Sequence, residues 1–119
     1  MNERKTAGVL KKVFSQCGPE IMRDGRRFDA YLMDLLGRKS YRAENMVLRR
    51  AADSDALFPL IHAYAITSEL VEWTIERLKT KSRLTAEDAV FVTRCAVIAL
   101  DGNTEVIPQP IPSGGSAPG

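Results

Sequence analysis

The chain has 119 residues, of which 45% are hydrophobic and 27% are charged, and its formal net charge at neutral pH is +2. These values are typical of one small globular domain and exclude collagen-like, disulfide-rich and wholly disordered chains. No run of about 18 uncharged apolar residues occurs, and no apolar segment follows the basic N-terminus, so we expect neither a transmembrane helix nor a signal peptide.

Two helices are predicted in the first third of the chain, where apolar residues recur at helical spacing. The first covers residues 6–16, with Thr6 as its N-cap. The Gly18-Pro19 pair ends this helix, and the proline suits the first turn of a short segment that follows. The second helix covers residues 26–36 and is followed by a glycine, which commonly ends a helix. Its apolar face contains Phe28, Tyr31, Leu32, Leu35 and Leu36.

A third helix and a short fourth one are predicted in the middle of the chain. Ser40 is a suitable N-cap for a helix over residues 41–52. Residues 55–65 are predicted to form a short, irregular helix, because Pro59 is compatible only with a first turn or a break. The apolar positions of the third helix are Tyr41, Met46, Val47 and Leu48.

The second half of the chain predicts two capped helices. One begins after Thr67 or Ser68, and its early glutamates and late basic residues complement the helix dipole. Trp73 and Arg77 lie one turn apart on this helix, and we expect them to stack. The other helix covers residues 86–100 and follows a Thr-x-x-Asp start signal. It is apolar on several sides, which places it at the centre of the bundle.

Beyond Gly102 the composition changes to proline, glycine and serine, which favour polyproline II and flexible chain. We therefore predict one helical domain over residues 1–102 and a flexible tail or linker over residues 103–119. No alternating strand pattern occurs. The predicted fold class is all-α, a compact bundle of about five helices with a disordered Pro/Gly-rich C-terminal tail.

The side chains that carry most catalytic and metal-binding chemistry are sparse. The chain contains no P-loop, GxGxxG, GxSxG, HExxH or EF-hand pattern. Glu72 and Glu76 have the spacing of two metal ligands on a helix, but the only histidine, His62, lies in another segment. Cys17 and Cys95 are too distant in the sequence for CxxC chemistry, and we expect them to be reduced thiols of a cytoplasmic protein. We predict no enzymatic activity, no cofactor and no metal.

Charge is distributed unevenly along the chain. Residues 1–50 contain 12 Lys and Arg against 6 Asp and Glu, whereas residues 51–119 contain 5 against 9. The basic half is expected to attract an acidic partner, or the basic half of one copy is expected to attract the acidic half of another. Basic residues surround the second and third predicted helices. The patch predicted to contact an acidic partner consists of Arg26, Arg27, Arg38, Lys39 and Arg42.

Short segments within residues 18–102 form a further pattern. These segments are Gly18-Pro19-Glu20-Ile21, Arg26-Arg27-Phe28, Asp34-Leu35, Tyr41-Arg42-Ala43-Glu44-Asn45, Leu48, Ala51-Ala52, Leu84-Thr85-Ala86-Glu87-Asp88-Ala89 and Ala99-Leu100-Asp101-Gly102. The pattern resembles an uncharacterised all-helical module of bacterial multidomain proteins, in which it is fused to signalling, kinase, chaperone-like or zinc-ribbon regions. The resemblance implies an all-helical fold, a bacterial source and a modular context, and it assigns no catalytic residue.

We therefore expect a noncatalytic helical protein-interaction or regulatory module of the bacterial cytoplasm, which docks a protein partner or an adjoining domain and does not bind membranes. An alternative is a nucleic-acid-binding domain that uses the same arginines. Residues 38–42 resemble a helix–turn–helix junction, although Glu44 lies in the helix that would read the DNA. A third hypothesis is a homodimer in which the basic and acidic halves meet.

Overall fold

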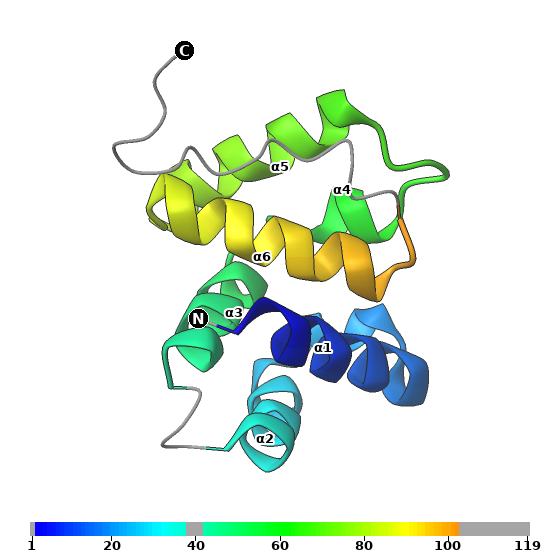
Figure 1. Ribbon diagram of the computed structural model, residues 1–119, viewed down its shortest axis with the longest axis vertical. Coiled ribbons are helices and arrows are strands. Elements are labelled where there is room, and N and C mark those ends of the chain that lie inside the picture. The colour runs from blue at the N-terminus through cyan, green and yellow to red at the C-terminus, as the bar shows by residue number, and fades with distance from the viewer. Residues whose placement is uncertain (1, 38–41, 103–119) are drawn as a thin grey trace.

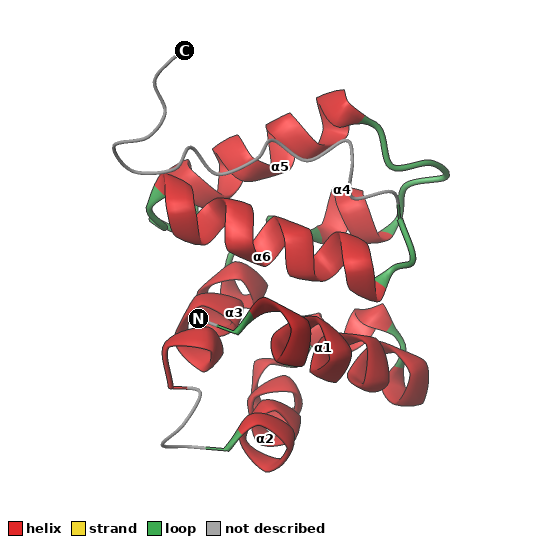
Figure 2. Ribbon diagram, in the orientation of Figure 1, coloured by secondary structure: helices red, strands yellow, loops and turns green. Residues whose placement is uncertain are grey.

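The described part of the chain consists of helices joined by short turns. The computed structural model describes residues 2–37 and 42–102, and Figures 1 and 2 show how they are arranged. The α-helices are α1 (Glu3–Cys17), α2 (Gly25–Leu36), α3 (Arg42–Asp53), α4 (Phe58–Ile61), α5 (Ser68–Thr80) and α6 (Ala86–Ala99), and η1 (Pro19–Arg23) is a 3-10 helix. The predicted all-α fold is confirmed. The predicted tail over residues 103–119 and the predicted N-cap Ser40 lie outside the described residues.

The last helix, α6, lies at the centre of the bundle, as its apolar composition predicts. It packs between α5 and α1 and also contacts α3 (Figure 1). Half of its 14 residues are buried. Several of these are small, such as Ala89 and Ala96, so the neighbouring helices approach closely.

The second helix, α2, packs against α1, η1 and α3 at the end of the molecule opposite α5 (Figure 1). Its predicted apolar face is confirmed, because Phe28, Leu32 and Leu36 are buried and the other two positions are partly buried. On α3, the buried side is formed by Val47, Leu48, Ala51 and Ala52. Because α2 and α3 pack side by side with these apolar faces in the core, their solvent-facing sides lie next to each other on the surface.

The prediction that the first helix begins at Thr6 is wrong. It begins at Glu3, and the side chain of Asn2 caps it by accepting a hydrogen bond of 2.9 Å from the backbone amide of Lys5. Thr6 is fully buried instead, and its hydroxyl donates to the backbone carbonyl of Asn2 at 2.6 Å. Asparagine is an equally good N-cap, and the earlier start lets α1 bury Thr6 and Ala7 against its neighbours.

Other predicted start signals are confirmed. Pro19 opens η1, and Pro59 lies in the first turn of α4, where a missing amide costs nothing. Thr67 and Thr85 cap α5 and α6, and each accepts a hydrogen bond from the backbone amide three residues later. These features depend on residues within one turn, which is why the sequence pattern predicts them.

Gly18 ends α1 in a conformation that is essentially restricted to glycine, with φ 81° and ψ 154°. Apart from its chain neighbours, no atom lies within 4 Å of the position that a Cβ would occupy. Gly18→Ala is therefore expected to lower the free energy of unfolding by about 1–3 kcal/mol through backbone strain alone. Urea denaturation followed by circular dichroism measures this change.

Gly8→Ala is the matched control, because Gly8 is helical, exposed and equally open around its Cβ position. This substitution is expected to raise the free energy of unfolding by about 0.5–1 kcal/mol, since alanine restricts the unfolded chain and favours the helix. Equal effects of the two substitutions would show that the backbone at Gly18 is unstrained.

Candidate functional site

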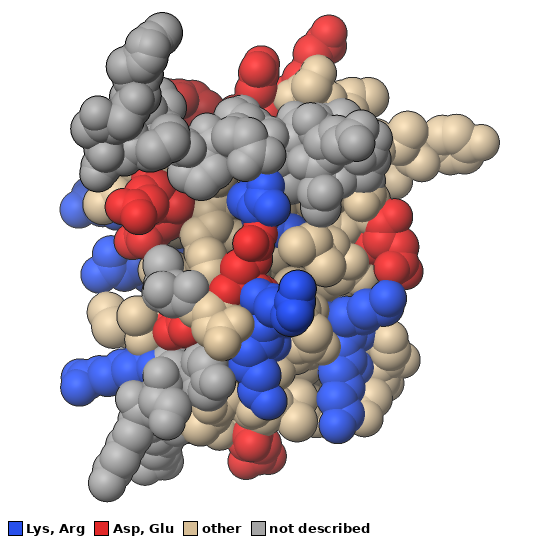
Figure 3. Space-filling view, viewed as in Figure 1, with Lys and Arg blue, Asp and Glu red and all other residues tan. Residues whose placement is uncertain are grey.

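The uneven charge of the sequence corresponds to two ends of the molecule. The basic half of the chain forms α1, η1, α2 and most of α3, whereas the acidic half forms α4, α5 and α6. On the face shown in Figure 3, Lys and Arg gather over α1, and carboxylates project at the end where α5 lies. The electrostatic potential at the basic end therefore favours negatively charged groups.

One residue of the predicted contact patch lies in a concave site. Arg42 is exposed in the first turn of α3 and lines a groove between α2 and α3. Arg26 and Arg27 are exposed in the first turn of α2, and neither lines that groove. Arg38 and Lys39 lie outside the described residues.

The groove between α2 and α3 has a volume of about 760 Å³ and is open to solvent. We call it the α2–α3 groove. Its lining combines three arginines with one aspartate and two methionines, so it is both basic and partly apolar. The described residues that line it are Asp29, Met33, Arg42, Asn45, Met46, Arg49 and Arg50.

The place of Met46 among the apolar positions of the third predicted helix suggested a core residue, but this prediction is wrong. Its side chain is 50% exposed, because Val47 and Leu48 occupy the inward side of α3 and Met46 is turned toward α2. Met33 of α2 is half-buried and faces the same groove. Methionine side chains are unbranched and polarizable, so they adapt to apolar surfaces of different shapes.

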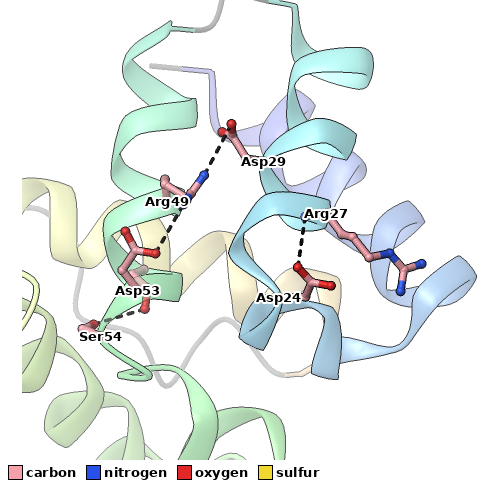
Figure 4. A network of polar contacts seen from close by, with 7 residues as sticks. Asp24, Arg27, Asp29, Arg49, Asp53 and Ser54 are labelled. Atoms are coloured by element: carbon pink, nitrogen blue, oxygen red, sulfur yellow. Dashed lines mark hydrogen bonds and ion pairs between the residues drawn. The ribbon is translucent and has the colours of Figure 1, made fainter.

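Arg49 fixes the two sides of the α2–α3 groove relative to each other (Figure 4). Its guanidinium lies 3.4 Å from a carboxylate oxygen of Asp29 on α2 and 3.3 Å from one of Asp53 on α3. A Cβ on Gly25 would lie only 3.2 Å from the Arg49 side chain, so this glycine leaves room for the arginine. Figure 4 also shows that Arg27 points away from Arg49.

Two other arginines of the groove remain available to a partner. Arg42 and Arg50 are exposed, and neither forms an ion pair with any residue in the ranges 2–37 and 42–102. Arg49 is largely neutralised by its two carboxylates. Among the described lining residues, the exposed positive charge without a carboxylate partner is therefore that of Arg42 and Arg50.

The basic surface continues from α3 onto the turn between α5 and α6. A hollow of about 210 Å³ shares Met46 and Arg50 with the α2–α3 groove and adds Arg83 together with one carboxylate, Asp88. Another, of about 420 Å³, is lined by Arg50, Arg83 and Lys81 among others. Sequence reasoning missed this continuation, because more than 30 residues separate Arg50 from Arg83 and no local pattern links them.

A separate basic hollow, which shares no lining residue with the α2–α3 groove, lies between α1 and α2. It has a volume of about 480 Å³, and Arg4, Lys5 and Lys12 line it together with apolar Val9 and Leu35. No acidic side chain is among its described lining residues. A spacing of four residues between Arg4, Gly8 and Lys12 is the signal that sequence reasoning could have used. This hollow provides a comparison for the α2–α3 groove.

Cys95 is a buried core residue on α6. Its side chain is fully inaccessible, and its thiol lies 3.8 Å from the backbone carbonyl of Glu3. Burial, together with the nearby charges of Glu3 and Glu44, raises the pKa of the thiol to about 12, although Arg94 opposes the shift. The thiol is therefore protonated and is a poor nucleophile. Cys95 and Cys17 are both free.

The surroundings of the single histidine are those of a surface residue in a polar and aromatic cluster. The His62 side chain is 52% exposed, and its Nε2 lies 3.2 Å from a carboxylate oxygen of Glu20. Its ring meets Phe58 edge-on, with 5.8 Å between the ring centres. Over residues 2–37 and 42–102, no three His, Cys, Asp or Glu side chains are grouped so as to hold a metal ion.

The chain matches no protein-family model, no curated protein and no solved structure. The resemblance to a bacterial helical module therefore stays a prediction. In the part of the chain that the structure describes, no helix has the length and apolar character needed to cross a bilayer.

Proposed function

We propose that this protein is a noncatalytic helical interaction module whose α2–α3 groove binds an acidic amphipathic helix of a protein partner. The observation that carries the proposal is the pairing of an apolar methionine lining with two exposed, unengaged arginines, Arg42 and Arg50. We also place the module in the bacterial cytoplasm, in line with the resemblance and with two free cysteines.

An acidic amphipathic helix suits both parts of the groove. Its apolar side chains bury surface against Met33 and Met46, which supplies affinity. Its carboxylates face Arg42 and Arg50, which speeds association and selects acidic partners. The volume of about 760 Å³ accommodates several side chains from one face of a helix.

The composition of the groove favours a protein over a nucleic acid. Phosphate contacts require cations and gain nothing from thioether side chains, whereas an amphipathic helix also buries apolar surface against Met33 and Met46. Glu44, in contrast, does not oppose nucleic acid, because it is only 5% exposed and accepts a 2.8 Å hydrogen bond from the backbone amide of Asn2. The apolar lining is thus the feature that separates the two hypotheses.

A charge-reversal experiment tests the proposal. The probe is a fluorescein-labelled helical peptide with leucines on one face and glutamates on the other, and fluorescence anisotropy measures its affinity. The double variant Arg42→Glu, Arg50→Glu is expected to bind the peptide at least about tenfold more weakly, because two attractive contacts become repulsive. Binding to the unaltered protein is expected to weaken as salt rises.

The double variant Arg4→Glu, Lys12→Glu is the matched control, since it changes the net charge equally but alters the hollow between α1 and α2. It is expected to retain most of the affinity. An equal loss in both double variants would show that only overall charge matters. Tighter binding of a labelled DNA duplex, with log affinity falling linearly with log salt, would replace the proposal by the nucleic-acid hypothesis.

A further inference from the structure

The outer surface of α5 has the chemistry that the α2–α3 groove is suited to bind. Glu69, Glu72, Trp73 and Glu76 recur at positions i, i+3, i+4 and i+7 and are all exposed. We call these four residues the α5 outer face. Trp73 and Arg77 stack as predicted, with the guanidinium 4.7 Å from the ring centre, yet Trp73 is still 44% exposed. Tryptophan is one of the residue types enriched at the energetic centres of protein interfaces.

The α5 outer face and the α2–α3 groove are complementary in charge and in apolar character. Three glutamates flank the tryptophan, and the groove presents Arg42 and Arg50 beside two methionines. Thioether sulfur makes favourable contacts with aromatic rings, so Met33 and Met46 form a suitable surface for an indole. The nearby Lys79 offsets part of the acidic charge, because it lies 3.5 Å from a carboxylate oxygen of Glu76.

The two surfaces lie at different ends of the same molecule. Figure 1 shows α5 at one end of the long axis and α2 at the other, with α6 and α1 between them. A chain cannot place its own α5 in its own groove, whereas a second copy can. Such a contact joins two different surfaces, so each pair retains one free groove and one free α5 outer face.

We infer that the α2–α3 groove binds the α5 outer face of a second copy of this chain, head to tail. The inference rests on the proposed function, because it names the acidic amphipathic helix that the groove accepts. Trp73 lies against Met33 and Met46, and the glutamates face Arg42 and Arg50. One helix face buries less area than a standard interface, so the association is weak and its extent grows with protein concentration. Salt weakens it.

Two variants of the full chain test the inference by disabling one surface each. The groove variant carries Arg42→Glu and Arg50→Glu. The α5 variant carries Glu72→Gln, Trp73→Ala, Glu76→Gln and Lys79→Gln. It loses the indole, two of the three glutamates and the lysine that pairs with Glu76, so the altered face does not become basic and gains no attraction to the reversed groove. Circular dichroism confirms that both variants are folded. Sedimentation velocity over about a hundredfold range of concentration measures their association.

The unaltered chain is expected to sediment faster as its concentration rises, and each variant alone is expected to remain a monomer. An equimolar mixture of the two is expected to form a dimer and nothing larger, because it contains one intact groove and one intact α5 outer face for each pair. A mixture that stays monomeric, or variants that associate as the unaltered chain does, would overturn the inference.

The acidic peptide separates failure of this inference from failure of the proposed function. The α5 variant has an intact groove and is expected to bind the labelled peptide with unchanged affinity. If the peptide binds but the mixture stays monomeric, the groove serves a different partner and the head-to-tail contact is wrong. If neither the peptide nor the second copy binds, both proposals are wrong.

Discussion

Phe28→Ala is expected to lower the free energy of unfolding by about 3–5 kcal/mol, the largest effect that we expect from a single substitution in this protein. Phe28 is fully buried and is the largest of the fully buried side chains in residues 2–37 and 42–102. It lies on α2, which packs against α1, η1 and α3, so its removal leaves a cavity beneath the helix that forms one side of the groove. Urea denaturation followed by circular dichroism measures the loss.

The conservative variant Phe28→Leu keeps most of the side-chain volume and is expected to cost about 1 kcal/mol. Peptide binding provides a second measurement, because α2 carries Asp29 and Met33 of the groove lining. Phe28→Ala is expected to weaken peptide binding even at temperatures at which the variant is folded. If Phe28→Ala lowers the free energy of unfolding no more than Phe28→Leu does, neighbouring side chains fill the space left by the ring and the expected cavity does not form.

The stability of the protein is expected to fall in alkaline solution because of Cys95. The pKa of its buried thiol, about 12, lies above the ordinary value of 9.0, so the folded chain holds this proton more tightly than the unfolded chain does. The resulting stabilisation is complete below pH 9 and is lost as the pH rises toward 12. Between pH 9 and pH 11 we expect a loss of about 2 kcal/mol from this thiol alone.

The comparison with Cys95→Ala isolates that contribution, because alanine cannot titrate. The free energy of unfolding of the variant, measured by urea denaturation at several pH values, is expected to decline less steeply with pH than that of the unaltered chain. Cys17→Ala controls for the loss of a cysteine as such, since Cys17 is the other free thiol. Parallel pH dependences for the unaltered chain and Cys95→Ala would contradict the raised pKa.

Most of the helices could be predicted from local patterns. Thr67 and Thr85 mark the starts of α5 and α6 through hydrogen bonds that span three residues. The apolar positions of α2 repeat with the helical period, and the apolar composition of α6 indicates its central place. The start of α1 was predicted wrongly because Asn2 and Thr6 are both suitable caps, and only packing against the rest of the bundle chooses between them.

The candidate site could be predicted only in part. Arg42 was expected to contact a partner, and it lines the α2–α3 groove. The exposure of Met46 was missed, because a methionine beside two buried residues has the pattern of a core position. Arg49 was not predicted to brace α2 against α3, since its contact with Asp29 joins residues that are 20 positions apart.

The sequence by itself determined the all-helical class, the N-caps of α5 and α6, and the buried face of α2, because these depend on hydrogen bonds and spacings within one or two turns. Only the tertiary structure decided which charged side chains share a surface. It turned Glu44 inward, brought Arg83 beside Arg50, and placed the α5 outer face and the groove at different ends. Such placements follow from how helices distant in the sequence pack together, which no local pattern encodes.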